Sequence, residues 1–393
     1  MKLFECQGCG QPLYFENTRC ESCGRRLGYL PAVQEVTALE ENEGAWEALA
    51  APGSRFRFCA NAEHDACNWL VADEEPGRYC LACRHNRTVP DLSNERNLLR
   101  WRRLEAAKRR LFYTLLRLGL PLSTRPQDPQ GLAFDFLADP SETSSGGPSI
   151  LTGHDNGLIT INIAEADDAE REQRRHSMGE PYRTLLGHFR HEIGHYFWNV
   201  LVRSDPSLER FRAVFGDERQ DYGEALRAHY ANGPRENWQE AFVSAYAGSH
   251  PWEDFAETWA HYLHIVDTLE TANAFGLKVR PRIALGAALA TEIDFDPHLE
   301  TDLNRLVSAW LPLTFAVNSL NRSMGQPDLY PFVLAPAAIA KMGFIHDRVH
   351  AAGGREPDAA GHDGALRAVI GGLKSRIAAP HQDCSPSPVW ERG

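Results

Sequence analysis

The sequence has no long hydrophobic run. A membrane-spanning helix needs about 20 mostly apolar residues, and no stretch of the 393-residue chain approaches that composition. A signal peptide also has no room at the start, because the first residues lead directly into a cysteine motif that begins at Cys6. We therefore expect a cytoplasmic protein that has no membrane partner.

An excess of positive charge is also lacking. The chain carries 41 Lys and Arg residues against 53 Asp and Glu residues, which gives a formal net charge of −12. The phosphates of nucleic acid would repel such a chain, so nucleic acid is not an expected partner. The sequence has no internal repeat and no glycine-rich phosphate-binding loop. These absences argue against a solenoid and against a nucleotide-binding site of that kind.

Cysteine is almost absent after residue 83. Eight of the nine cysteines precede residue 84, and only Cys384 follows. The first four form two Cys-x2-Cys pairs, the spacing of a zinc ribbon, in which each short turn aims two thiolates at one tetrahedral metal. Gly10 and Gly24 each follow the second cysteine of a pair and suit the tight turns. The predicted ligands of this first structural zinc are Cys6, Cys9, Cys20 and Cys23.

A second set of four cysteines has one intact pair and one stretched pair. Its members are Cys59, Cys67, Cys80 and Cys83. His64 or His85 could replace Cys59 or Cys67 as a ligand, so the sequence predicts either one or two structural zinc ions. Neither set should form disulfides in the cytosol. A closed site of four ligands leaves no position for a substrate, which is why we assign these metals a structural role.

The residues 191–195 read His-Glu-Ile-Gly-His and carry the most informative pattern of the chain. Apolar residues at helical spacing surround this stretch, so His191 and His195 should lie one turn apart on one face of a buried helix. Two histidines in this arrangement can bind one zinc ion, and Glu192 between them can act as a general base. The pattern predicts a zinc-dependent hydrolase of amide bonds.

A catalytic zinc needs a third protein ligand besides the two histidines. Residues 250–261 form a second segment of helical period, with Pro251 in its first turn. On this helix Glu253, Glu257 and His261 share one face. Each of the three could bind zinc or hold a ligand in place, and spacing alone does not separate them.

Residues 253–257, together with Tyr246, are similar to the zinc-ligand helix of the anthrax lethal factor group of zincins. This resemblance implies that Glu253 is the third zinc ligand and that Glu257 holds a ligand in place. It also implies that Tyr246 lies near the reacting carbonyl. From the residues alone, Tyr246 could equally be a tyrosine of the core.

The whole chain up to about residue 350 resembles the bacterial zinc-binding metallopeptidases that carry an N-terminal zinc ribbon. The segments that carry this resemblance include residues 80–88 and 318–325. The resemblance implies one catalytic zinc, a peptide or protein substrate and a zincin-like catalytic domain. The zinc ribbon would then be a module through which a protein partner docks.

Two other functions are compatible with these residues. The chain could be a binding or regulatory protein whose zinc ribbons do the work while the zincin domain is an inactive scaffold. It could also hydrolyse a non-peptide amide, because the same zinc-activated water and base serve either bond. The presence of His191, Glu192, His195 and Glu253 together favours a peptidase, because an inactive site usually loses its base or a ligand.

The motifs divide the chain into four parts and predict an α+β fold. We expect a zinc ribbon or treble-cysteine module at residues 1–30 and a second cysteine-rich, zinc-binding segment at residues 31–92. A mostly helical, zincin-like metallopeptidase domain with a small sheet should follow at residues 93–350. Residues 351–393 are rich in Gly, Pro, Ala and charged residues, so we expect a disordered tail in which Cys384 is an exposed thiol.

Local patterns predict several elements. The mixed, acidic residues 30–55 should form a connector or a peripheral helix, and residues 94–119 a helix capped by Ser93. The basic face opposite its apolar stripe could contact an acidic partner or nucleic acid, although a solvated helix face is the commoner case. Its residues are Arg96, Arg100, Arg103, Lys108 and Arg110. Strands are expected at residues 132–137 and 158–163, and the second is placed either to pair with extended substrate or to pair within its own sheet.

Overall fold

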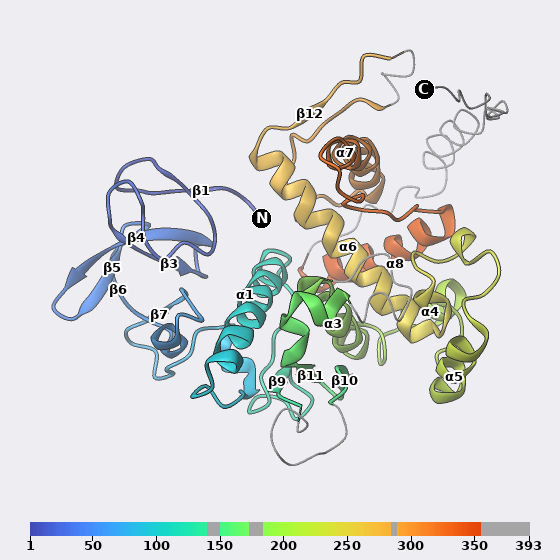
Figure 1. Cartoon of the computed structure of the whole chain (residues 1–393), viewed down its shortest axis with the longest axis horizontal. Helices are drawn as coiled ribbons and strands as arrows, with labels where there is room; N and C mark the ends of the chain where they lie inside the picture. Colours follow the sequence, from blue (N-terminus) through green and yellow to red (C-terminus); the bar gives the residue numbers. More distant parts are fainter. Residues whose placement is uncertain (140–149, 173–183, 284–288, 355–393) are drawn as a thin grey trace, which may run out of the picture.

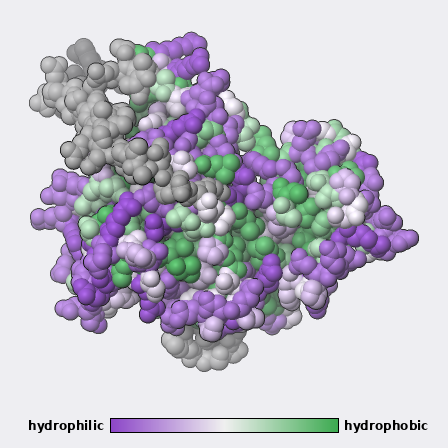
Figure 2. Space-filling view, turned by 180° about the vertical axis from the view of Figure 1, so that it is seen from behind, coloured by the Kyte–Doolittle hydropathy of each residue, from purple (hydrophilic) through white to green (hydrophobic). Residues whose placement is uncertain are grey.

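The computed structural model describes residues 1–139, 150–172, 184–283 and 289–354. Most of the expected tail, including Cys384, lies outside these residues. Among the described helices, none is both long enough and apolar enough to cross a bilayer. On the face shown in Figure 2, hydrophobic side chains gather near the middle and hydrophilic side chains surround them.

The N-terminal part of the chain is built from β-strands (Figure 1). The short strands β1 (Phe4–Glu5) and β2 (Pro12–Leu13) pair with each other. A five-stranded antiparallel sheet of order β3-β4-β5-β6-β7 follows. Its strands are β3 (Arg26–Leu30), β4 (Glu35–Asn42), β5 (Ala45–Ala48), β6 (Ala51–Phe58) and β7 (Leu70–Ala72).

The expectation of a connector or helix at residues 30–55 is therefore wrong. The sheet has apolar residues on both faces, which removes the alternation that reveals a strand that is buried on one side only. Val36 and Ala38 of β4 belong to the main core, whereas Leu39 belongs to a small cluster on the opposite face. Of the acidic residues that suggested a connector, Glu40, Glu41 and Glu43 lie at the exposed end of β4 and in the turn after it, whereas Glu35 begins β4 and Glu47 lies in β5.

A second sheet has the order β10-β11-β9-β8. Its strands are β8 (Asn86–Thr88), β9 (Ala133–Leu137), β10 (Gly153–Asp155) and β11 (Leu158–Asn162). Strands β10 and β11 form a hairpin, in which they pair antiparallel across a turn with positive φ at Asn156 and Gly157. However, β9 occupies the other side of β11, so β11 pairs within its own sheet and β10 is the edge strand.

The remaining elements are mainly helices. They are α1 (Glu95–Arg117), α3 (Leu185–Leu201), α4 (Leu208–Phe215), α5 (Tyr222–Asn232), α6 (Pro251–Ala274), α7 (Leu303–Ser323) and α8 (Pro336–Ala352), with the short strands β12 (Lys278–Val279) and β13 (Thr291–Glu292) between α6 and α7. In Figure 1, the blue N-terminal sheet lies on the outer side of α1, and α3 and α6 lie on its other side. A single hydrophobic core extends from the cysteine-rich part to α8.

Helix α1 differs from the expectation at its cap and on its basic face. Asn94, not Ser93, caps it, because the Asn94 side chain accepts hydrogen bonds from two backbone N–H groups of the first turn. The predicted solvated basic face is also wrong in part. Arg100 is 1% exposed and forms an ion pair with Asp167, and Lys108 is fully buried beside Glu105. These pairs compensate the cost of removing the cations from water.

Helices α3 and α6 cross in close contact at Gly194. A Cβ atom at this position would lie 2.9 Å from the Ala256 Cα atom and 3.2 Å from the Trp259 Cβ atom. A larger residue would push the two helices apart, whereas glycine lets the backbones approach. The crossing therefore brings the histidine face of α3 against the first turns of α6.

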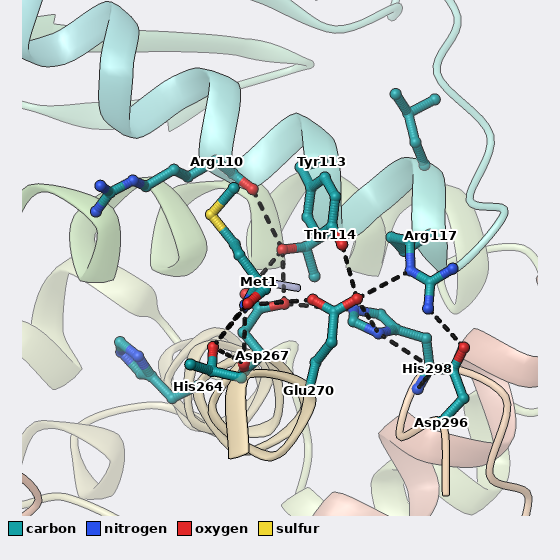
Figure 3. A network of polar contacts seen from close by, with 12 residues as sticks. Met1, Arg110, Tyr113, Thr114, Arg117, His264, Asp267, Glu270, Asp296 and His298 are labelled. Carbon is teal, nitrogen blue, oxygen red and sulfur yellow. Dashed lines mark hydrogen bonds and ion pairs between the residues drawn. The ribbon is translucent and has the colours of Figure 1, made fainter. Parts of the chain in front are cut away.

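A buried polar network joins α1, α6 and the segment before α7 (Figure 3), and an ion pair between Arg190 and Asp267 extends it to α3. Asp267 of α6 accepts hydrogen bonds from Thr114 of α1 at 2.7 and 2.9 Å and forms an ion pair with Arg190 of α3. Glu270, one turn further along α6, accepts a hydrogen bond from Tyr113 at 2.7 Å and lies 3.2 Å from the Arg117 Nε atom. The network thus holds three helices together by charge as well as by packing.

We expect Asp267→Asn to lower the free energy of unfolding by about 3–5 kcal/mol, because it leaves Arg190 buried without its ionic partner. Chemical denaturation of the zinc-loaded protein measures this change. The matched control is Asp328→Asn, which breaks the exposed pair with Arg322 and should change stability little. Equal effects of the two substitutions would show that the buried network does not stabilise the helix packing.

Candidate metal centre

Helix α3 places two histidines on one face. The helix begins after Thr184, whose hydroxyl accepts a hydrogen bond from the Gly187 backbone N–H. His191 and His195 follow one turn apart, and their ring centroids are 4.9 Å from each other. Phe189, Ile193 and Phe197 are fully buried, so the apolar stripe of α3 is packed in the core and the histidine rings face α6.

Helix α6 places Glu253 opposite these histidines. The helix starts with Pro251 after the cap residue His250, and Glu253, in its first turn, is 1% exposed. The Glu253 Oε2 atom lies 3.1 Å from His191 Nε2 and 3.5 Å from His195 Nε2. Zinc binds nitrogen and oxygen at about 2.0–2.2 Å, which puts tetrahedral ligand atoms roughly 3.3 Å apart. The observed distances match that spacing.

The Glu253 Oε2 atom also has no hydrogen-bond donor among the described residues, although it is buried. A buried carboxylate oxygen without a donor is costly unless a cation satisfies it. This atom and the two histidine nitrogens lie within 4.8 Å of one another. The three residues therefore fit a zinc ion, with Glu253 as the carboxylate ligand.

The structure distinguishes between the three acidic and histidine candidates on α6. Glu257 lies one turn beyond Glu253 and accepts a hydrogen bond of 2.7 Å from the Nδ1 atom of His191. Its other oxygen accepts a hydrogen bond of 2.6 Å from the Ser244 hydroxyl. His261 points elsewhere and contacts the Tyr330 hydroxyl through Nδ1 at 2.6 Å. Glu257 is thus placed to orient the His191 ring, and His261 is not placed with the ligands.

The two carboxylates are ionised because of the histidines beside them. Burial raises the pKa of Glu253, but the nearby His195 and His191 outweigh burial and hold this pKa well below its usual range. Burial also raises the pKa of Glu257, yet the hydrogen bond from His191 lowers it to about 2. Both groups therefore carry the negative charge that a zinc ligand and its orienting partner need.

Glu192 is buried beside the ligands, and no described residue forms a hydrogen bond or ion pair with its carboxylate. It directly precedes Ile193 and follows His191 on α3. A carboxylate without a fixed partner can accept a proton from water. The structure thus leaves Glu192 available for proton transfer.

Two tyrosines face the same centre, and the sequence predicted only one of them. The Tyr246 ring lies 6.0 Å from the His191 ring. Tyr222, at the start of α5, donates a hydrogen bond of 2.6 Å from its hydroxyl to Glu253 Oε1. Burial is the main cause that raises the pKa of both hydroxyls, so both remain protonated donors. No sequence motif links Tyr222 to a glutamate 31 positions away, which is why it was missed.

Aromatic rings enclose His195. The Trp252 ring lies 3.9 Å from the His195 ring, and the His154 ring lies 6.1 Å from it in a stacked arrangement. Trp252 comes from the first turn of α6 and His154 from β10. Neither was a predicted site residue, although Trp252 precedes Glu253 directly. A cavity beside these rings continues away from the metal centre along β10 and the end of α3.

Two further histidines near this centre have other partners. His188 Nδ1 lies 2.5 Å from Glu165 Oε2, and His264 contacts Arg190. Residues 318–325 contact the centre only indirectly, through Tyr330 and His261. Asn318 exchanges hydrogen bonds of 2.8 and 3.0 Å with the backbone of Tyr330, whose hydroxyl contacts His261. These contacts are structural and lie away from the ligand atoms.

Both cysteine sets come together as tetrads. The four sulfur atoms of each set lie within 4.8 Å of one another. Measured distances are 3.7 Å for Cys6–Cys23, 3.6 Å for Cys9–Cys20 and 3.7 Å for Cys67–Cys80. Zinc binds sulfur at about 2.3 Å, which separates tetrahedral sulfur atoms by roughly 3.8 Å. Both tetrads therefore suit zinc, and none of their cysteines forms a disulfide.

No histidine is needed in the second tetrad. His85 uses its Nδ1 atom to contact the Leu132 carbonyl at 2.8 Å, and the His64 ring packs against Trp101. The tetrad itself contacts helix α1, because the Cys83 sulfur lies 3.5 Å from Glu105 Oε2. All four of its cysteines are buried. A closed set of this kind stabilises the fold and offers no open coordination position.

One more group of three potential ligands lies in the network of Figure 3. Atoms of Asp267, Glu270 and His298 lie within 4.8 Å of one another. Arg190 and Arg117 already form ion pairs with the two carboxylates, so a metal ion would face two guanidinium groups. The existing cations balance the charge of this cluster, and its arrangement is that of a structural network.

We expect Glu257→Gln to weaken zinc binding at the α3–α6 site by about 10- to 100-fold, because the His191 ring loses its charged hydrogen-bond partner. Competition with a zinc chelator measures this affinity, and the cysteine sites serve as an internal reference. Glu292→Gln, which changes an exposed glutamate by the same chemistry, is the control. An affinity equal to that of the unaltered protein would show that Glu257 does not support the ligand.

Comparison with known proteins matches two families along the chain. Residues 3–94 match a zinc-ribbon domain family, and residues 97–348 match the family described as "putative zinc-binding metallo-peptidase". Uncharacterised proteins of Mycobacterium tuberculosis and Mycobacterium bovis are each 44% identical over 348 residues, which is 88% of this chain and 94% of the relative. No solved structure is significantly similar. The chain belongs to this zinc-binding metallo-peptidase family.

Proposed function

We propose that the protein is a zinc-dependent peptidase with a zincin-like catalytic domain of the carboxylate-ligand kind. The observation that carries this proposal is the meeting of three ligand atoms from α3 and α6, at distances that suit zinc, beside a buried glutamate without a partner. His191, His195 and Glu253 would hold the metal. The likeness of residues 253–257 to the lethal factor group of zincins points the same way.

When bound, zinc lowers the pKa of a coordinated water and polarises the carbonyl to be cleaved. Glu192 accepts the proton of the attacking water and delivers it to the amine that leaves. Its burial and its lack of a fixed partner support this role. Glu257 and Ser244 keep the His191 ring oriented through the reaction.

Tyr246 and Tyr222 supply hydrogen-bond donors beside His191 and Glu253. Burial keeps the pKa of both hydroxyls above its usual value. Tyr246 donates to the oxyanion that forms during attack, and one such donor typically contributes about 3 kcal/mol to stabilising the transition state. Tyr222 holds Glu253 through its 2.6 Å hydrogen bond and fixes the carboxylate ligand.

The edge strand β10 is the place where an extended substrate would pair. Its outer side has no strand among the described residues, and His154 of this strand lies beside His195. A peptide that adds a strand at this edge would run directly past the metal centre. A peptide or protein is therefore the substrate class that the fold accommodates.

The zinc ions of the two cysteine tetrads would have a structural role. They fold the N-terminal module, which lies against α1 and would dock a protein partner or substrate in the cytoplasm. Each tetrad has four protein ligands and is closed, whereas the α3–α6 site has three and leaves one coordination position open.

Metal analysis of His191→Ala tests the metal site. This variant should lose one zinc per chain and keep the zinc of the cysteine tetrads, because only the α3–α6 site loses a ligand. Circular dichroism before and after zinc removal controls for unfolding. A variant that retains as much zinc as the unaltered protein would remove the α3–α6 site from consideration.

Glu192→Gln tests the reaction. The substitution keeps the size of the side chain and the three zinc ligands but removes the base, so zinc content should stay the same while peptide hydrolysis falls by at least about 100-fold. Cleavage of a peptide library, read by mass spectrometry, measures both proteins. Unchanged turnover would exclude Glu192 as the base, and no turnover by the unaltered protein would favour a binding protein with an inactive scaffold.

A further inference from the structure

A groove beside the metal centre carries a cation that no described residue neutralises. The groove has a volume of about 420 Å³ and runs between β10, the end of α3, the segment before α5 and the start of α6. It shares Tyr222 and Trp252 with the metal centre. A substrate residue next to the cleaved bond would therefore enter this groove.

Aromatic rings form the inner wall. The Tyr222 and Trp252 rings lie 5.6 Å apart and nearly perpendicular, and Trp198 of α3 lines the same space. Trp252 in turn packs on His195. Aromatic walls of this kind bind the aliphatic part of a side chain but do not discriminate between different terminal groups.

Arg203 supplies a charged group at this groove. Its backbone N–H donates to the Trp198 carbonyl at 3.0 Å, and its neighbour Val202 is fully buried, so the position from which the side chain extends is fixed. The guanidinium makes no hydrogen bond or ion pair with any described residue. Other arginines of this region are already engaged, as Arg212 is with Glu218.

The two acidic residues of the groove do not engage Arg203. Glu218 is neutralised by Arg212 through contacts of 3.0 and 2.6 Å. Asp155 accepts a hydrogen bond of 2.9 Å from Asn156 and forms no ion pair of 4.0 Å or less with Arg203. Neither carboxylate lies within ion-pair distance of Arg203, so its guanidinium can pair with a ligand group, while Asp155 remains as a second charge of the groove.

We propose that this groove selects a substrate residue that carries a carboxylate, with the stem of that residue against Trp252 and Tyr222 and the carboxylate on Arg203. This proposal rests on the proposed peptidase function and names its substrate class. A guanidinium recognises a carboxylate through two parallel hydrogen bonds, which a neutral amide does not match. The carboxylate comes either from an acidic side chain or from the free C-terminus of the substrate.

Peptide pairs that differ in one group test the proposal with the zinc-loaded full chain. Cleavage of a library first gives the position next to the cleaved bond. Peptides with Glu or Gln at that position, and peptides with a free or amidated C-terminus, are then compared by kcat/KM. We expect a preference of about tenfold for one of the two carboxylates, a value typical of a partly exposed charge-assisted pair. The arm that shows the preference identifies the source.

Arg203→Gln should bring this ratio close to one, whereas Arg322→Gln, which removes an equal charge outside the groove, should keep it. Asp155→Asn should keep or increase the preference for the carboxylate. The proposal is wrong if the unaltered protein cleaves peptides and Arg203→Gln leaves the ratio unchanged. A preference for Lys or Arg that Asp155→Asn abolishes would overturn it too.

Binding separates this proposal from the proposed function. Calorimetric titration of the Glu192→Gln protein with the same Glu and Gln peptides measures selectivity without turnover. If the unaltered protein cleaves no peptide but the Glu peptide binds about tenfold more tightly in an Arg203-dependent manner, the peptidase proposal fails and the groove assignment stands. The peptides with a free or amidated C-terminus are titrated in the same way, and equal binding within both pairs contradicts the groove assignment.

Discussion

The close crossing of α3 and α6 is the constraint on which the site depends. His191 and His195 come from one helix and Glu253 from the other, so the distance between the helix axes sets the distances between the ligand atoms. Gly194, within the His-Glu-x-x-His stretch itself, allows this approach, since a Cβ there would meet the α6 backbone. A tetrahedral metal tolerates little change in its ligand distances. Gly194 therefore influences the distances between the ligand atoms only through the packing of the two helices.

Besides the close crossing at Gly194, the polar network around Asp267 also connects α3 and α6. Arg190 directly precedes His191, and its ion pair with Asp267 connects α3 to the middle of α6. Tyr113 extends this connection to the N-terminal module, because it donates to Glu270 on one side and packs against Phe15 at a ring distance of 5.5 Å on the other. The second cysteine tetrad also touches α1 through Glu105. The cysteine-rich module is thus continuous with the packing that positions the ligands.

The sequence predicted the parts of the site that are local in the chain. The histidine pair, Glu192 and the regular cysteine pairs depend on spacing within one helix or one turn, and spacing can be read directly. Glu253 and Glu257 share a helix face, so only the family resemblance ranked them, and the structure separates them by their partners. Tyr222 and Arg203 lie near the ligands because of tertiary packing, and no local sequence motif predicts their position. Residues 30–55 were misjudged because a sheet covered on both faces loses the alternation of a strand.

The arrangement of charge explains how the site keeps its shape before a metal arrives. Buried Glu253 and partly buried Glu257 face the same imidazole, and the two negative charges would repel each other without a cation between them. Burial lowers the pKa of His191, but the two carboxylates outweigh it and raise that pKa well above its usual value. His191 therefore lies between two carboxylates that favour a positive charge at the position where zinc would bind.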